Sequence, residues 1–253
     1  MTDAVTTAAL GVAGLLAGTV DAIAGGGGLV SVPALLWAGL PPHLALGTNK
    51  LQSCVGTTMA VQRYHAAGLL DLRSTRVAVA ATALGALVGT VAVLRLDDSV
   101  LRRVVPWLLV PVAAWVLARP RLGDDPAPPR SGAVPFGLLA GGTLGFYDGF
   151  FGPGCGTFWT AACIRFRGMG LARATAFTKV VNLTSNLAAL AVFAAMGSVD
   201  PAPAAAMIVG QAAGGRLGAS LAVRHGAPLI RVVFAAVVCA LVGRLLWQSF
   251  GGA

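Results

Sequence analysis

Two glycine-rich stretches, each just after an aspartate, are the residues of this chain best suited to binding chemistry. Asp21 and Asp148 each stand four residues before the first glycine. The stretches contain Gly25, Gly26, Gly27 and Gly28 in the first half, and Gly152, Pro153 and Gly154 in the second. Glycine lets a backbone leave helical geometry more easily than other residues. Both stretches interrupt apolar runs, where non-helical backbone is tolerated only if it is buried in protein or lines a polar cavity, so they predict a binding site.

Helices that begin directly after these breaks would favour an anion. A half-helix starting after Gly28, and another after Gly156, would each point free backbone N–H groups at the space before it. Those groups and the helix dipole make an anion site without any basic side chain. The alternative is that the glycines only permit tight helix crossing. Two aligned copies beside a carboxylate and a lysine favour the binding site.

Lys50 and Lys179 lie within long apolar segments, far from either end. A lysine at the centre of a membrane helix costs about 2.5–3.5 kcal/mol on insertion scales and is rarely incidental. One interpretation is a pair of cations that attracts an anionic substrate. The other is a pair of internal salt bridges, Lys50 with Asp21 and Lys179 with Asp148, that fix the broken helices. Both interpretations stay open, since a substrate can compete with a carboxylate for a lysine.

The two aspartates also have two interpretations. A buried carboxylate can take up and release a proton and so couple transport to a proton gradient. It can equally cap the N–H groups of the loop that follows it, and we favour this structural role for Asp21 and Asp148. No His/Cys/Asp cluster suggests a metal centre, and no cofactor is expected.

Further polar side chains accompany the lysines on the same segments. In lipid, such side chains either bridge helices or line a path. The secondary site candidates are Asn49, Thr178, Asn182 and Asn186. Arg216 is a midspan arginine that would pair with Asp148 or bind an anion, and Cys155 lies inside the second break.

The composition defines the class of protein in which these residues act. Of 253 residues, 57% are hydrophobic and only 11% are charged, against about 25% in soluble domains. We therefore expect an all-α integral membrane protein with the lipid bilayer as its surroundings. The net charge of +9 is spread singly between apolar segments, so no nucleic-acid partner is expected. No nucleotide-binding signature or catalytic cluster is present, which predicts that the protein is not an enzyme.

The chain divides into ten apolar segments, five in each half. They are 4–24, 29–40, 43–67, 76–96 and 100–118, then 133–151, 157–166, 171–196, 201–223 and 227–250. The segments 29–40 and 157–166 are shorter than the roughly 20 residues that a spanning helix needs. We therefore expect half-helices there, and leave open whether they cross or re-enter.

The two halves carry the same landmarks in the same order, which indicates an internal duplication. Asp21 corresponds to Asp148 at an offset of 127 residues. At an offset of 129 residues, Lys50 corresponds to Lys179, Gly85 to Gly214 and Gly89 to Gly218. We predict one membrane repeat at 1–118, a connecting loop at 119–132 and a second repeat at 133–253. If all ten segments cross, the repeats are inverted, as in many secondary transporters, with the glycine-broken helices near the midplane. Eleven arginines then flank the inner side and four the outer side, as the positive-inside rule requires.

Four stretches of the chain resemble a known protein family. The stretches Asp21-AIAGGGGLVSVPAL and Ala45-LGTNK, then Gly145-FYDGFFGPGCGTF and Ala174-TAFTKVVN, are similar to the TauE/SafE sulfite exporter family, also called the 4-toluene sulfonate uptake permease group. The resemblance covers essentially the whole chain. It differs between halves, since the lysine motif is Gly-Thr-Asn-Lys in one and Ala-Phe-Thr-Lys in the other.

The resemblance implies a secondary transporter of small sulfur-containing or organic anions, among them sulfite, sulfoacetate and aromatic sulfonates, in the bacterial inner membrane. It implies that the glycine stretches, Asn49, Lys50, Thr178, Lys179 and Asn182 form the substrate site. A passive anion channel, a non-transporting membrane scaffold and a cation transporter that uses the two aspartates remain alternatives. A homodimer is compatible with the sequence.

Overall fold

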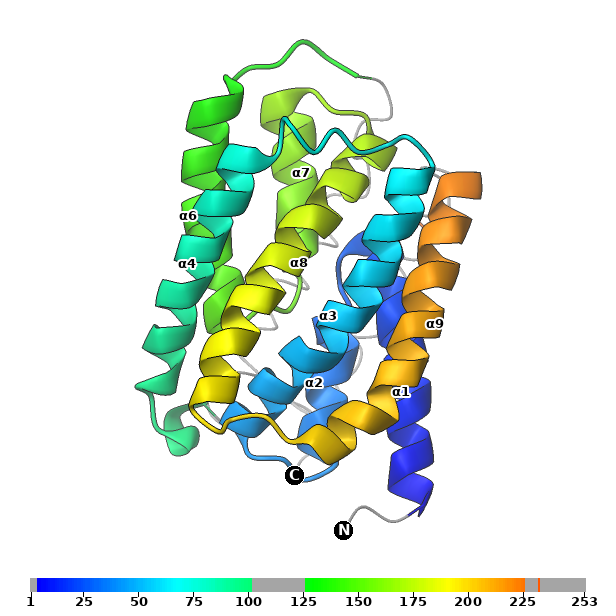
Figure 1. The fold of residues 1–253 in the computed structure, drawn as a ribbon, viewed down its shortest axis with the longest axis vertical. Coiled ribbons are helices and arrows are strands. Elements are labelled where there is room, and N and C mark those ends of the chain that lie inside the picture. Colours follow the sequence, from blue (N-terminus) through cyan, green and yellow to red (C-terminus); the bar gives the residue numbers. More distant parts are fainter. Residues whose placement is uncertain (1–3, 102–125, 226–231, 233–253) are drawn as a thin grey trace, which may run out of the picture.

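The computed structural model describes residues 4–101, 126–225 and 232, and all of the secondary structure in this part of the chain is helical (Figure 1). The helices are α1 (Ala4–Ala24), α2 (Gly28–Trp37), α3 (Pro42–Ala66), α4 (Arg76–Leu94), α6 (Ala133–Phe150), α7 (Cys155–Arg167), α8 (Leu171–Ala195) and α9 (Pro201–His225). The expected all-α fold is therefore confirmed for these residues. Among them, α1, α4 and α8 are long and apolar enough to cross a membrane.

The helix boundaries lie within a few residues of those predicted. The α1 segment ends at Ala24 as expected, and the short segments become α2 and α7. Apart from residue 232, the predicted segment 227–250 lies outside the described residues, as does nearly all of 100–118. Within the predicted connecting loop, the described part from 126 onward packs on the end of α7, where the amide N–H of Ala127 donates to the Gly168 carbonyl at 3.0 Å.

The short helices α2 and α7 turn back on the helices before them. Leu10 at the start of α1 shares one apolar cluster with Leu35 of α2 and Met207 of α9. In the second half, Phe136 at the start of α6 shares a cluster with Cys163 near the end of α7. Each glycine stretch is therefore the tip of a helical hairpin inside the molecule, as Figure 1 shows.

Small residues allow two pairs of helices to pack in close contact. The helices α1 and α9 run side by side in the same direction, and so do α4 and α6. A Cβ atom added to Gly14 would lie 2.5 Å from the Met207 carbonyl oxygen, and one added to Gly145 would lie 2.6 Å from that of Thr82. Such distances leave no room for a side chain, so glycine sets the helix separation here.

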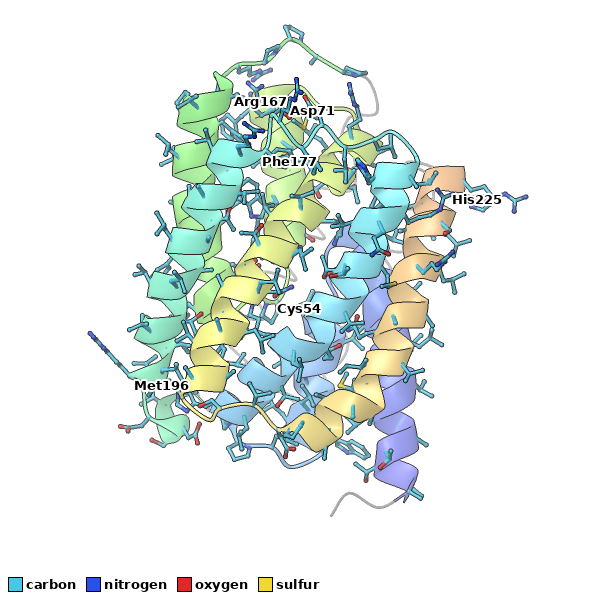
Figure 2. The ribbon with its side chains drawn as sticks, in the orientation of Figure 1. Cys54, Asp71, Arg167, Phe177, Met196 and His225 are labelled. Atoms are coloured by element: carbon cyan, nitrogen blue, oxygen red, sulfur yellow. The ribbon has the colours of Figure 1, made fainter. Side chains whose placement is uncertain are left out.

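The long helices α3 and α8 run through the middle of the structure and carry the two lysines. Lys50 and Lys179 are almost fully buried, at 2% and 0% exposed. The ends of the bundle differ in charge, since the arginines of the described residues lie mainly at the end that carries Asp71, Arg167 and His225 in Figure 2, opposite Met196.

Candidate functional site: a polar cavity between two glycine hairpins

The tips of the two hairpins meet inside the protein. A Cβ atom added to Gly25 would lie 2.6 Å from the backbone of Gly156, and one added to Gly28 would lie 3.2 Å from Pro153. Gly25 also has a φ of +77°, a backbone conformation that residues with a Cβ atom rarely adopt. The two glycine stretches are therefore required both for their own turns and for their contact with each other.

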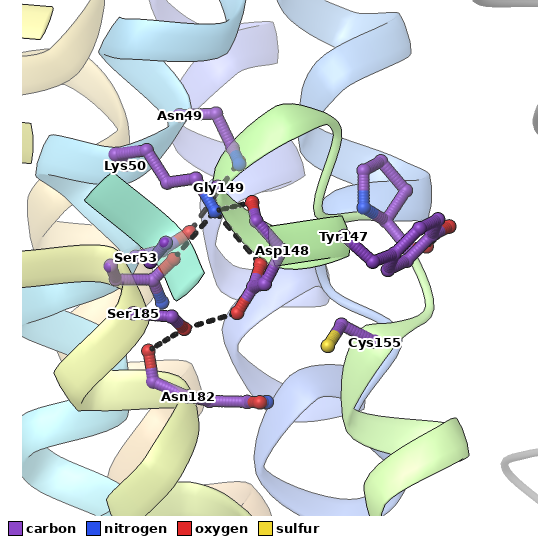
Figure 3. Close-up of polar contacts among 12 residues, drawn as sticks. Asn49, Lys50, Ser53, Tyr147, Asp148, Gly149, Cys155, Asn182 and Ser185 are labelled. Carbon is purple, nitrogen blue, oxygen red and sulfur yellow. Dashed lines mark hydrogen bonds and ion pairs between the residues drawn. The ribbon is translucent and has the colours of Figure 1, made fainter. Parts of the chain in front are cut away.

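Lys50 of α3 forms a salt bridge with Asp148 of the second half. Its Nζ lies 2.8 Å from Asp148 Oδ1 and 2.6 Å from the Asp148 carbonyl oxygen (Figure 3). The same Nζ donates to Asn186 Oδ1 at 3.1 Å, and the hydroxyl of Ser185 donates to Asp148 Oδ2. The three hydrogens of this ammonium group are thus all used, as a buried cation requires.

Lys179 of α8 forms the corresponding bridge with Asp21 of the first half. Its Nζ lies 3.0 Å from Asp21 Oδ2 and also donates to the Asp21 carbonyl oxygen. The Asp21 carboxylate accepts a longer bond, of 3.4 Å, from the amide N–H of Gly27. The carboxylate side chain is 21% exposed, whereas that of Asp148 is only 6% exposed.

The salt bridges predicted within each half are therefore wrong. Each lysine pairs with the aspartate of the other half, because the hairpin tip of one half reaches the long helix of the other. The predicted pairing of Arg216 with Asp148 is also wrong, since Arg216 is exposed on α9 and Asp148 is bonded to Lys50.

Two hydroxyl groups form hydrogen bonds that connect the short helices α2 and α7 to the long helices α3 and α8. Ser31 of α2 donates to Asn49 Oδ1 at 2.5 Å, and that oxygen also accepts a bond from Gln52 Nε2 at 2.8 Å. In the second half, Thr160 of α7 lies 3.1 Å from the hydroxyl of Thr178. Asn49 and Thr178 hold the same place in their halves, each one residue before a lysine.

A small polar cavity lies where these elements meet. Its volume is about 30 Å³. Its lining consists of Asp21, Gly25, Gly28, Asn49, Lys50, Ser53, Asp148, Gly152, Gly154, Cys155, Gly156, Asn182 and Asn186. The cavity is thus built from both halves of the chain and contains both aspartates.

Most of the predicted site residues line this cavity, but some do not. The predicted residues that are absent from its lining are Gly26, Gly27, Pro153, Thr178 and Lys179. The lining residues that the sequence had not assigned to the site are Ser53, Cys155 and Gly156. Ser53 follows Lys50 by three positions on a helix, which places both on one face and was a usable signal.

Asn182 is the residue of the lining whose side chain is left without a full set of partners. It is 5% exposed, and its Oδ1 has no hydrogen-bond partner within the described part of the chain. Buried polar atoms are almost always paired, so this acceptor calls for a partner that the described residues do not supply.

Apolar helices around a cavity of buried charges define the class of multi-pass membrane proteins, in which intramembrane ionisable residues mark functional sites. A family model described as sulfite exporter TauE/SafE matches residues 10–245, and the chain belongs to this family.

Proteins of other organisms are similar to this chain over nearly its whole length. A protein of Escherichia coli strain K12, named probable membrane transporter protein YfcA, is 40% identical over 94% of this chain and 88% of its own length. A probable membrane transporter protein of Haemophilus influenzae is 37% identical over 93% of this chain and 92% of its own length. No solved structure matches the chain significantly.

Proposed function

We propose that this protein is a secondary transporter of a small sulfur-containing or organic anion, of the sulfite or organosulfonate class. The observation that carries the proposal is the polar cavity between the two glycine hairpins, with Lys50 in its wall. The family to which the chain belongs and the printed names of its relatives support the same function.

The site would bind the anion through the starts of α2 and α7 together with Lys50, Asn49, Asn182 and Asn186. Lys50 lines the cavity, whereas Lys179 acts through Asp21. The two lysines therefore have different roles in this proposal. A bound anion takes over hydrogen bonds that Lys50 now donates to Asp148 and Asn186, and Lys179 holds the hairpin tip that carries Asp21. Asp21 and Asp148 would have a structural role, since each holds a lysine and Asp21 also accepts a hydrogen bond from the N–H of Gly27.

An inverted duplication gives this site a means of alternating access. It is supported by contacts that recur between the halves. The salt bridge of Lys50 with Asp148 matches that of Lys179 with Asp21. The close approach of Gly85 to Gly142 matches that of Gly214 to Leu15, at the offsets of 129 and 127 residues seen in the sequence.

The directions of the hairpins support the same arrangement. In Figure 1, α1 rises from the end that carries the N-terminus, whereas α6 descends from the opposite end. The hairpins would therefore approach the midplane from the two sides of a bacterial inner membrane, and the arginine-rich end would face the cytoplasm.

The volume of the cavity favours a carrier over an open channel. A cavity of about 30 Å³ is far smaller than the roughly 300–1,000 Å³ of ordinary small-molecule sites, so the helices would have to move for a substrate to enter. Rocking of one repeat against the other would open the site to one side at a time.

Transport in proteoliposomes tests this function. Purified protein would be reconstituted with sulfite inside, and uptake of labelled sulfite into the vesicles would be followed as exchange. We expect saturable uptake that is lost when Lys50→Met is combined with Asp148→Asn, a double variant that removes both charges and leaves no uncompensated carboxylate. A channel would show no exchange-driven accumulation, and a scaffold would show no uptake.

A further inference from the structure

The charges at the cavity limit which form of an anion can bind there. The charged side chains are Asp21 of α1, Lys50 of α3, Asp148 of α6 and Lys179 of α8, with the Cys155 thiol of α7 beside them. The two aspartates and the two lysines are fully paired with one another. The side chains of the site therefore contribute a net charge of zero.

The remaining positive potential comes from the backbone. The helices α2, of 10 residues, and α7, of 13 residues, begin at the cavity wall, and neither has a side-chain cap. Within the described residues, the amide N–H groups of Gly28 and Gly156 donate no backbone hydrogen bond. The N-terminus of a helix acts as about half a positive charge, so two of them balance about one negative charge.

A second observation points to the same ligand. Asn182 lines the cavity, and its buried Oδ1 is an acceptor with no hydrogen-bond partner among the described residues. A fully deprotonated oxyanion presents acceptors only and cannot satisfy this atom. An oxyanion that retains one proton presents a donor to Asn182 and further oxygens to the N–H groups of α2 and α7.

We propose that the site takes singly charged oxyanions, so that a substrate such as sulfite binds as hydrogen sulfite, with its O–H donated to Asn182. The inference rests on the proposed function and defines the substrate form for that same site. A doubly charged anion would bring one negative charge for which the site has no partner, and burying an unpaired charge is strongly unfavourable.

Titration calorimetry of the purified protein in detergent tests the inference. Sulfite would be titrated from pH 6 to pH 9, with methanesulfonate as the matched control because its single charge does not change over this range. We expect the apparent Kd for sulfite to rise about tenfold for each pH unit once the doubly charged form predominates. The Kd for methanesulfonate should stay constant, and sulfate should bind at least tenfold more weakly than methanesulfonate.

Substitution of Asn182 separately tests the hydrogen bond that the O–H of hydrogen sulfite donates to this residue. Asn182→Ala should weaken the binding of hydrogen sulfite at pH 6 by about five- to tenfold. Its effect on methanesulfonate, which has no proton to donate, should be smaller. Thr143→Ala is the control, because the Thr143 hydroxyl is exposed on α6 and bonds only to the Leu139 carbonyl.

The outcomes separate the two proposals. If sulfite and methanesulfonate both bind but sulfite keeps one Kd at all pH values, or if sulfate binds as tightly as methanesulfonate, the inference on the protonated form is wrong and the anion site stands. If Asn182→Ala weakens both anions equally, the role of the retained proton is wrong. If no anion of the panel binds, the proposed function itself fails at this site.

Discussion

Replacing Gly25 by alanine probes the contact between the two hairpin tips. The substitution has two costs. A residue with a Cβ at a φ of +77° loses about 1–2 kcal/mol in this left-handed conformation. The new Cβ would also lie 2.6 Å from the Gly156 backbone, and relieving such overpacking costs about 1–3 kcal/mol. We therefore expect a total destabilisation of about 2–5 kcal/mol.

Gly39 is the matched control for this substitution. It has a φ of +90°, and an added Cβ would meet nothing within 4 Å. Gly39→Ala therefore carries the conformational cost alone. The difference between the two variants isolates the contact between Gly25 and Gly156, at about 1–3 kcal/mol.

Thermal unfolding of the purified protein in detergent measures this difference. For a chain of this size, 1 kcal/mol corresponds to about 2–4 °C in Tm. Gly25→Ala should melt about 2–12 °C below Gly39→Ala. Equal Tm values for the two variants would refute the close contact of the hairpin tips and with it the construction of the cavity.

Three further substitutions test individual contacts. In a double-mutant cycle on stability, Lys50→Met and Asp148→Asn should couple by about 1–3 kcal/mol, more strongly than Lys50→Met and Asp21→Asn; the reverse order would restore the pairing within each half. Tyr64→Phe should lower the free energy of unfolding by about 1 kcal/mol, because the buried Tyr64 hydroxyl donates to the Ala22 carbonyl at 2.8 Å, and an unchanged stability would contradict that bond. Arg216→Gln should change stability and anion binding by less than about 0.5 kcal/mol, since Arg216 is exposed, and a loss of binding would show that it contributes to the site.

The helices could be predicted from the sequence because each is an apolar run with marked ends. The start of α3 at Pro42 and the end of α1 before Gly25 follow from the restricted backbone of proline and the freedom of glycine. The glycine stretches predicted a binding site, and residues of both stretches line the polar cavity in the structure. These signals are local, so they do not depend on the tertiary arrangement.

The pairing of the charges could not be predicted in the same way. Asp21 lies nearer to Lys50 than to Lys179 in the sequence, yet it pairs with Lys179. The partner is decided by where the hairpin tips meet, and the alignment of the two halves gives no information about contacts between them. The absence of Lys179 from the cavity lining has the same origin.

The exposure of Arg216 could have been predicted from the spacing of the glycines around it. Gly214 and Gly218 are four residues apart and mark the face of α9 that packs against α1. Arg216 lies two positions from each of them, which places it on another face of the helix. The energetic cost of an arginine in the middle of a membrane span led to the prediction of a buried partner. The face of the helix on which Arg216 lies decides its exposure instead.

Ligand-dependent thermal stabilisation most directly tests the claim that the cavity binds a small anion through Lys50. The purified protein would be melted with sulfite, thiosulfate, methanesulfonate and acetate, beside the double variant Lys50→Met with Asp148→Asn. A ligand that binds only the folded state raises the Tm, by an amount that corresponds to about 2.7 kcal/mol at 100 times its Kd. We expect at least one sulfur anion to raise the Tm of the wild-type protein while the Tm of the double variant stays unchanged. An equal rise in both proteins, or no rise in the wild type with any of these anions, would contradict the claim.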